Sequence, residues 1–289
     1  MFNKSLILAL GTLLLFSACS SKKKPKPKPP IVNNSTITQK ALIMGVSDYA
    51  GNSNDLGGID LDVNKMQTLF SSWGFDVDTL SHSMSFEQKM AQYASSLNSD
   101  DVFIFYYSGH GSFTPDTSHD ELDGQDELIV LSDSDTNLYI LDDKINILLN
   151  KIKARKLIIF DSCNSGTSLK SSYANNSGSG GTTISTQIKF MYAPKSAADD
   201  SIQNASIANT DTNGTYLYYA ACRDNEQSLA SSNGSLFTNA FVNHVQLSQS
   251  ASWTHQKTLS ILQNRFHPKL SASNENLKNS SLKTYLKIE

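Results

Sequence analysis

The chain has 289 residues, 39% of them hydrophobic and 18% charged, so it can bury a core, and collagen, coiled coil and wholesale disorder are excluded. Six basic residues and no acid precede residue 31; beyond it 18 Lys and Arg face 27 Asp and Glu, a net charge of −9. This acidic balance argues against a nucleic-acid partner and permits a cationic substrate. Three cysteines, Cys19, Cys163 and Cys222, are too few for a disulfide framework.

The amino-terminal segment predicts an export signal. Its apolar run, residues 6–16, would rise about 16 Å as a helix, against the roughly 30 Å hydrocarbon core of a bilayer, so it is too short to span. Ser17 and Ala18 before Cys19 resemble a bacterial lipoprotein signal, in which residues 1–18 are removed and Cys19 is lipidated. An ordinary cleaved signal is the alternative.

Residues 19–37 include a Lys/Pro-rich tract that predicts a stiff polyproline II tether between a membrane and a folded domain. An arm that binds nucleic acid is the alternative, but beside a lipoprotein signal the tether is the simpler interpretation. The signal and the tether together predict a protein of the bacterial cell envelope, anchored by lipid in the outer membrane and facing the periplasm.

Residues 38–289 predict one α/β domain. Short, wholly apolar runs alternate with runs of helical period, which indicates a mostly parallel sheet with helices on both faces. Strands are expected at 41–46, 75–80, 102–107, 156–160, 215–220 and 282–288, and helices at 59–73, 85–97, 142–153 and 236–245. A composition rich in Ser, Asn, Gly and Thr predicts a long flexible loop at about 167–214.

Two motifs follow two of these strands. Residues 108–112 read Ser-Gly-His-Gly-Ser after the strand at 102–107, and residues 161–166 read Asp-Ser-Cys-Asn-Ser-Gly after the strand at 156–160. Because the carboxyl ends of parallel strands meet at one sheet edge, a histidine and a cysteine are expected close together. This is the arrangement that a thiol nucleophile and its base require; a structural histidine and an inert buried cysteine are the alternative.

The two motifs resemble the histidine and cysteine blocks of the caspase-like cysteine peptidases, on the metacaspase side of that family. Residues 221–226 and 234–238 resemble the strand, loop and helix that come next, so the resemblance covers about residues 39–250. It implies a caspase-like three-layer sandwich with a mostly parallel central sheet.

The resemblance also implies catalytic roles. Cys163 would be the nucleophile and His110 the general base and acid of a Cys-His dyad. The backbone N–H groups of Gly111 and Cys163 would bind the tetrahedral oxyanion, and a glycine lets the main chain approach the substrate closely.

In metacaspases the equivalents of Asp62, Ser108 and Asp161 form the pocket for the residue before the scissile bond, and two carboxylates there select Arg or Lys. A carboxylate beside a thiol raises the thiol pKa, so Asp161 suits a substrate contact better than thiol activation. Caspases proper hold an aspartate with arginines, one of them directly after the cysteine, where this chain has Asn164. The alternative role for the two acids is loop hydrogen bonding or helix capping.

Residues 120–127 resemble the acidic loop of metacaspases, and mapping residue by residue gives Asp126, Asp142 and Asp143 as ligands of a calcium ion. No cofactor is required on this interpretation, and calcium would act as an activator. A merely solvated acidic loop is the alternative, and a further family ligand after the cysteine has no match here.

The sequence thus predicts a lipid-anchored cysteine endopeptidase that cleaves peptide or protein substrates after Arg or Lys. The two alternatives are an inert caspase-fold binding module and a peptidase of the same clan with another specificity. Lys170, Lys189 and Lys195 in the expected loop would then be candidate points of self-cleavage. An oxidising compartment could also join Cys163 to Cys222 and silence the thiol.

Overall fold

The computed structural model describes residues 36–80, 85–115, 125–133, 135–163, 185–193, 214–223 and 226–289. The chain divides into two units, Met1–Thr36 and Ile37–Glu289, and all described helices and strands lie in the second. The predicted signal, Cys19 and nearly all of the tether therefore lie outside the described residues. Within the described ranges, no helix has the length and apolarity needed to cross a bilayer.

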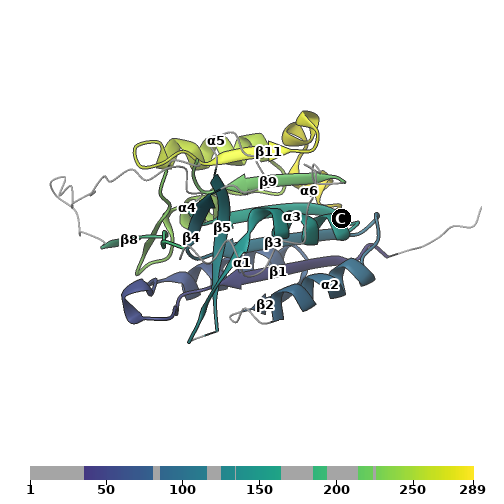
Figure 1. Cartoon of the computed structure of the whole chain (residues 1–289). Coiled ribbons are helices and arrows are strands. Elements are labelled where there is room, and N and C mark those ends of the chain that lie inside the picture. Colours follow the sequence, from purple (N-terminus) through teal and green to yellow (C-terminus); the bar gives the residue numbers. More distant parts are fainter. Residues whose placement is uncertain are drawn as a thin grey trace, which may run out of the picture. The chain divides into compact units, whose positions relative to one another are not determined.

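Six described strands form the central sheet in the order β11-β9-β7-β3-β1-β2 (Figure 1). All pairs are parallel except β11 with β9 at one edge. The strands are β1 (Gln39–Gly45), β2 (Asp76–Leu80), β3 (Val102–Ser108), β7 (Arg155–Asp161), β9 (Tyr216–Ala220) and β11 (Lys269–Ala272). Every residue of β3 is buried, as its apolar sequence predicts for a strand covered on both faces.

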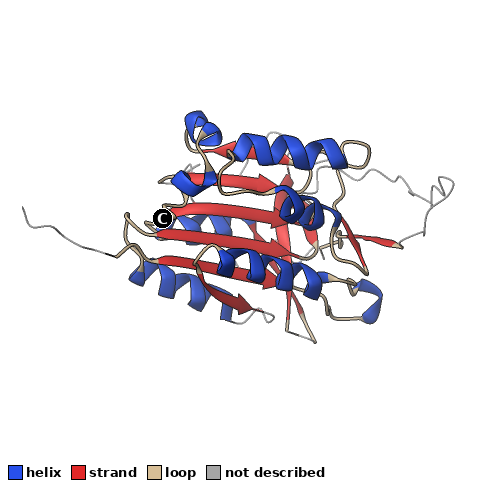
Figure 2. Cartoon of the chain, turned by 180° about the vertical axis from the view of Figure 1, so that it is seen from behind, coloured by secondary structure: helices blue, strands red, loops and turns tan. Residues whose placement is uncertain are grey.

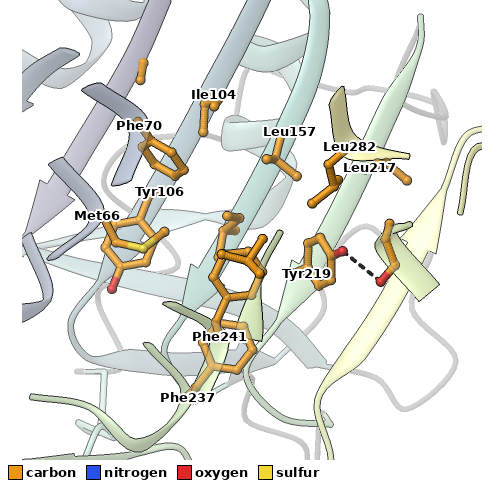
Figure 3. Close-up of a cluster of buried hydrophobic side chains, with 14 of the residues drawn as sticks. Met66, Phe70, Ile104, Tyr106, Leu157, Leu217, Tyr219, Phe237, Phe241 and Leu282 are labelled. Atoms are coloured by element: carbon orange, nitrogen blue, oxygen red, sulfur yellow. Dashed lines mark hydrogen bonds between the residues drawn. The ribbon is translucent and has the colours of Figure 1, made fainter. Parts of the chain in front are cut away.

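Helices cover both faces of this sheet, which gives the predicted three layers (Figure 2). They are α1 (Ile59–Ser72), α2 (Phe86–Ser96), α3 (Asp142–Lys151), α4 (Leu236–His244), α5 (Ala251–Leu262) and α6 (Leu282–Tyr285), with 3-10 turns η1 (Asn52–Asn54) and η4 (Glu275–Asn279). On one face Met66 and Phe70 of α1 and Phe237 and Phe241 of α4 pack against the strands (Figure 3). On the other face α2 and α3 do so.

The register places three strand ends at one level. Gly45 of β1 pairs with Ser108 of β3, and Ser108 pairs with Asp161 of β7. The loops that follow these strands therefore leave the sheet at the same edge, which is where the site was expected.

Two smaller sheets lie outside the sequence-based expectations. Three further described strands, β4 (Gly111–Pro115), β5 (Gln125–Ser132) and β6 (Asn137–Leu141), form an antiparallel sheet where an acidic loop was expected. Strand β8 (Thr186–Ile188) pairs antiparallel with β10 (Leu229–Ser231). Because β8 falls inside 167–214, the prediction of one continuous loop over that range is wrong.

The prediction of a last strand at 282–288 is also wrong, because Leu282–Tyr285 forms helix α6. The Ser281 side chain caps its first turn by accepting from the Thr284 N–H. Leu282, Tyr285 and Leu286 are buried, and their spacing of three and four residues is helical. The last strand along the chain is instead β11, which lies at one edge of the central sheet.

Candidate active site

The structure brings the histidine and cysteine motifs together. His110 and Cys163 each follow, by two residues, the paired positions Ser108 and Asp161. A Cβ atom on Gly111 would lie 1.8 Å from the carbonyl oxygen of Cys163, so the two main chains are in contact and only glycine fits there. The two side chains thus lie at one sheet edge, on loops from neighbouring strands.

His110 is buried and its orientation is fixed. The His110 ring packs against Tyr49 with centroids 4.6 Å apart, and the backbone N–H of His110 donates to the Tyr49 hydroxyl at 2.8 Å. Nε2 lies 2.7 Å from the Asn54 carbonyl, which can only accept, so Nε2 carries the hydrogen. Nδ1 is then the basic nitrogen, and among the described residues it has no hydrogen-bond partner.

Burial lowers the pKa of His110 below its usual 6.5, although the carbonyl of Asn54 opposes the shift. Burial likewise raises the pKa of the Cys163 thiol well above its ordinary value, and the neighbouring Cys222 adds to this. Both groups are therefore neutral near pH 7. A thiol in this state attacks only if an imidazole removes its proton as the bond forms.

The thiol is held by Ser228, the residue directly before β10. The Ser228 N–H donates to Cys163 Sγ at 3.2 Å, and Sγ lies 3.6 Å from the Ser228 carbonyl. No disulfide joins Cys163 to Cys222, and Cys222 is fully buried in the core as its apolar surroundings predict.

Residues 185–193 of the same chain lie across this site. The Lys189 carbonyl accepts from the N–H groups of Gly111 at 2.9 Å and Cys163 at 3.4 Å, the two groups that were expected to bind an oxyanion. The Lys189 N–H donates to the Ser228 carbonyl at 3.1 Å, which continues the pairing of β8 with β10. The main chain of this segment thus lies as an extended substrate would.

The Lys189 side chain is 0% exposed and fills a pocket formed by the three predicted substrate-binding residues. Its ammonium nitrogen lies 2.8 Å from Asp161 Oδ1 and 3.9 Å from Asp62 Oδ2. It also donates to Ser108 Oγ at 2.8 Å and to the Asp161 carbonyl at 2.7 Å. Ser108 in turn donates to Asp62 at 2.9 Å.

The sequence did not identify the residues that hold these carboxylates. Ser228 Oγ donates to Asp161 at 2.8 Å and Thr238 Oγ1 does so at 2.6 Å. The Ser235 N–H donates to Asp62 at 2.8 Å. Ser235 and Thr238 stand at the start of α4, where unpaired N–H groups and the helix dipole favour anions. The Ser-x-x-Thr spacing of Ser235 and Thr238 at a helix start could have indicated these two residues from the sequence. No sequence pattern indicated Ser228.

Burial is the main influence on the Asp62 carboxyl and raises its pKa, whereas the Lys189 ammonium lowers it. A basic side chain in the pocket therefore favours the ionised form of Asp62. An acidic side chain there would oppose it.

The predicted calcium ligands lie on two elements: Asp126 is in β5, and Asp142 and Asp143 begin α3. Within the described ranges, no group of three or more His, Cys, Asp or Glu side chains is placed to hold a metal ion. Residues 120–124 of the acidic loop lie outside those ranges, as do Asn164, Lys170 and Lys195. An acid in the first turn also stabilises a helix, which gives Asp142 and Asp143 a structural role.

Comparison with known proteins agrees with this geometry. Residues 38–283 match the family described as the caspase domain. The chain belongs to the caspase domain family. Metacaspase-1B of Aspergillus niger is 33% identical over 158 residues, 49% of this chain and 36% of that protein. Metacaspase-3 of Arabidopsis thaliana is 32% identical over 148 residues, 45% of this chain and 41% of that protein. The chain thus spans about two fifths of the length of these relatives.

Solved structures show the same fold. A protein of Geobacter sulfurreducens superposes with a TM-score of 0.67 at 24% identity, covering 84% of this chain and 97% of that one. Caspase-1 from Spodoptera frugiperda superposes with a TM-score of 0.54 at 12% identity, covering 82% and 89%. The predicted membership of the caspase-like family and the predicted fold are both confirmed.

Proposed function

We propose that the protein is a cysteine endopeptidase that hydrolyses peptide bonds after Arg or Lys through a Cys163–His110 dyad. The observation that carries the proposal is Lys189, whose carbonyl and side chain occupy the positions that a substrate's carbonyl and basic side chain would take. Membership of a peptidase family supports the reaction class.

In the proposed reaction Cys163 Sγ attacks the substrate carbonyl carbon while His110 Nδ1 takes the thiol proton. The N–H groups of Gly111 and Cys163 bind the oxygen as it becomes negative. The imidazolium then gives its proton to the departing amine, which leaves a thioester on Cys163. Water activated by His110 hydrolyses this thioester and restores the thiol.

The charges of the pocket support the basic preference. A lysine or arginine brings one positive charge to Asp62 and Asp161, whereas an aspartate would place three carboxyls in one desolvated space, at a cost of several kcal/mol. Asn164, in place of the arginine that follows the caspase cysteine, is consistent with this preference.

We also propose that the chain cleaves itself between Lys189 and Phe190. Until it does, Lys189 keeps other substrates out of the pocket, so activity toward a second protein would follow this cleavage. Of the three candidate lysines, only Lys189 lies in a described range.

Two further proposals concern the amino-terminal segment and calcium. Lipidation of Cys19 would anchor the protein in the bacterial envelope, in the outer membrane facing the periplasm, with residues 19–37 as the tether. Incorporation of a labelled fatty acid, absent from Cys19→Ser, tests this anchoring. Calcium held by Asp126, Asp142 and Asp143 would act as an activator.

The proposed function is tested with peptides that differ only in the residue before a fluorescent leaving group: Arg, Lys or Asp, each with and without calcium. We expect kcat/KM for Arg and Lys to exceed that for Asp at least about 100-fold, with no hydrolysis by Cys163→Ala. Absence of hydrolysis by the wild type, together with no labelling of Cys163 by a thiol probe, would indicate the binding-module alternative. Preference for Asp or a neutral residue would indicate another specificity.

The pH dependence of self-cleavage tests the role of His110. Because burial lowers its pKa below 6.5, the imidazole stays neutral and basic down to that pH, and protonation then removes the base. We therefore expect the rate to fall on the acid side with a midpoint below pH 6.5, measured by intact mass on freshly purified protein. An acid limb centred at or above about pH 7 would contradict a neutral resting dyad. Circular dichroism at each pH controls for unfolding, since a histidine buried neutral also destabilises the fold below pH 6.5.

A further inference from the structure

The segment across the site continues beyond Lys189 in contact with the protein. The Met191 N–H donates to the Gly111 carbonyl at 3.1 Å, while the Gly111 N–H donates to the Lys189 carbonyl at 2.9 Å. Gly111 and Phe190 thus form a parallel bridge at the start of β4. The two residues that follow the proposed scissile bond are therefore held in register by the main chain.

Met191 is the most enclosed of these residues. It is 7% exposed and belongs to the same buried cluster as Tyr49 and Ile129. Its Sδ accepts from Asn137 Nδ2 and from the Tyr139 hydroxyl, each at 3.6 Å. Asn137 is itself fixed, because its Oδ1 accepts from the Ala50 N–H at 2.9 Å. A thioether is a weak acceptor, and two donors aimed at it favour sulfur over a plain hydrocarbon.

Phe190, which precedes it, is half-buried and lies on an aromatic surface. Its ring stacks on Phe113 of β4 with centroids 5.8 Å apart and an angle of 29° between the planes. Tyr192, which follows Met191, is 71% exposed, and its ring meets the Phe190 ring in a T-shaped contact with centroids 4.9 Å apart. The protein therefore encloses only the first two side chains after the proposed scissile bond, those of Phe190 and Met191.

The side of the scissile bond that precedes Lys189 is more open. Ile188 is 38% exposed, and Thr186 and Gln187 are exposed too. Gln187 makes two hydrogen bonds at this surface, from the Gly57 N–H and to the Asp55 carbonyl. Apart from Lys189, the buried side chains of this segment are thus those that follow the proposed scissile bond.

We propose that the site selects substrates by the two residues after the scissile bond, with Phe113 receiving an aromatic side chain and Asn137 with Tyr139 receiving methionine. This inference rests on the proposed function and narrows its substrate class to a basic residue followed by an aromatic residue and methionine. These pockets are built from β4 and β6, the small sheet beside the dyad, and not from the strands that form the lysine pocket.

The test uses peptides with the sequence of residues 186–192, Thr-Gln-Ile-Lys-Phe-Met-Tyr, with a fluorophore and a quencher beyond the two ends. They are incubated with wild-type protein whose own cleavage has ceased. Replacing the methionine by glycine removes the buried side chain, and we expect kcat/KM to fall between about 10-fold and about 100-fold. Replacing the exposed tyrosine by glycine is the matched control, and we expect a change within about twofold.

Equal rates for the methionine and glycine peptides would overturn the inference and leave the proposed function intact. If the protein hydrolyses neither these peptides nor a lysine peptide with a fluorescent leaving group, both the inference and the proposed function are overturned.

Tyr139→Phe tests the enzyme side, because it keeps the ring and removes only the donor to sulfur. We expect it to reduce the preference for the methionine peptide over a leucine peptide, measured as the ratio of the two kcat/KM values. An unchanged preference would show that the Tyr139 hydroxyl does not recognise the methionine sulfur and would overturn the assignment of Tyr139 to this pocket.

Discussion

Wild-type protein incubated alone is expected to break between Lys189 and Phe190, whereas Cys163→Ala stays whole. The carbonyl of Lys189 already lies at the N–H groups of Gly111 and Cys163, so the intact chain holds its own substrate in place. Loss of a catalytic nucleophile lowers such a rate by at least about 10⁴-fold. Intact mass should show two fragments, and the second should begin Phe-Met-Tyr on amino-terminal sequencing.

Two controls sharpen this experiment. Cys222→Ala removes the other buried thiol and keeps the Cys163 nucleophile, so this variant should still cleave itself. Because the segment already lies in the site, the rate should not change on dilution. The same fragments from Cys163→Ala would contradict the assignment of the nucleophile, and an uncleaved wild type that hydrolyses lysine peptides would contradict self-cleavage alone.

The meeting of His110 and Cys163 could be predicted because it depends on local signals. The apolar runs 102–107 of β3 and 157–160 of β7 mark these strands as central and parallel, and each motif follows at the carboxyl end. Asp62 is different: nothing in its spacing shows that helix α1 brings it to Ser108, and only the resemblance to metacaspases indicated that role.

The occupation of the site by Lys189 could be proposed only as one of three possibilities. The composition around it predicts a loop, and β8 has three residues, too few for a periodic signal. Residues far away in the sequence hold Lys189: Asp161, at a separation of 28 residues, pairs with its charge, and Ser108, at a separation of 81, accepts a hydrogen bond. Similarly, Leu282–Tyr285 fits a strand or a helix by apolar content, and packing against the core decides for the helix.

Lys189→Glu is expected to lower the rate of cleavage after residue 189 by at least about 10³-fold. Its carboxylate would face Asp62 and Asp161 in a space without water, at a cost of several kcal/mol. Lys189→Arg keeps the charge and should cleave within about tenfold of the wild type. Lys189→Met keeps much of the side-chain length without the charge and should fall between the two. The time course of intact mass measures all four proteins.

Thiol reactivity then separates selection by charge from general destabilisation. If the glutamate cannot enter the pocket, the segment leaves and uncovers Cys163, which is 2% exposed in the occupied site, while Cys222 stays in the core at 0%. Iodoacetamide should therefore label Cys163 faster in Lys189→Glu than in the wild type, without labelling Cys222. Labelling of both thiols would show that the fold has loosened, and cleavage of Lys189→Glu at the wild-type rate would show that the carboxylates do not select the residue before the bond. Asp62, Ser108 and Asp161 come from three separate elements, and a positive charge that pairs with both carboxylates favours the position of the main chain at the thiol.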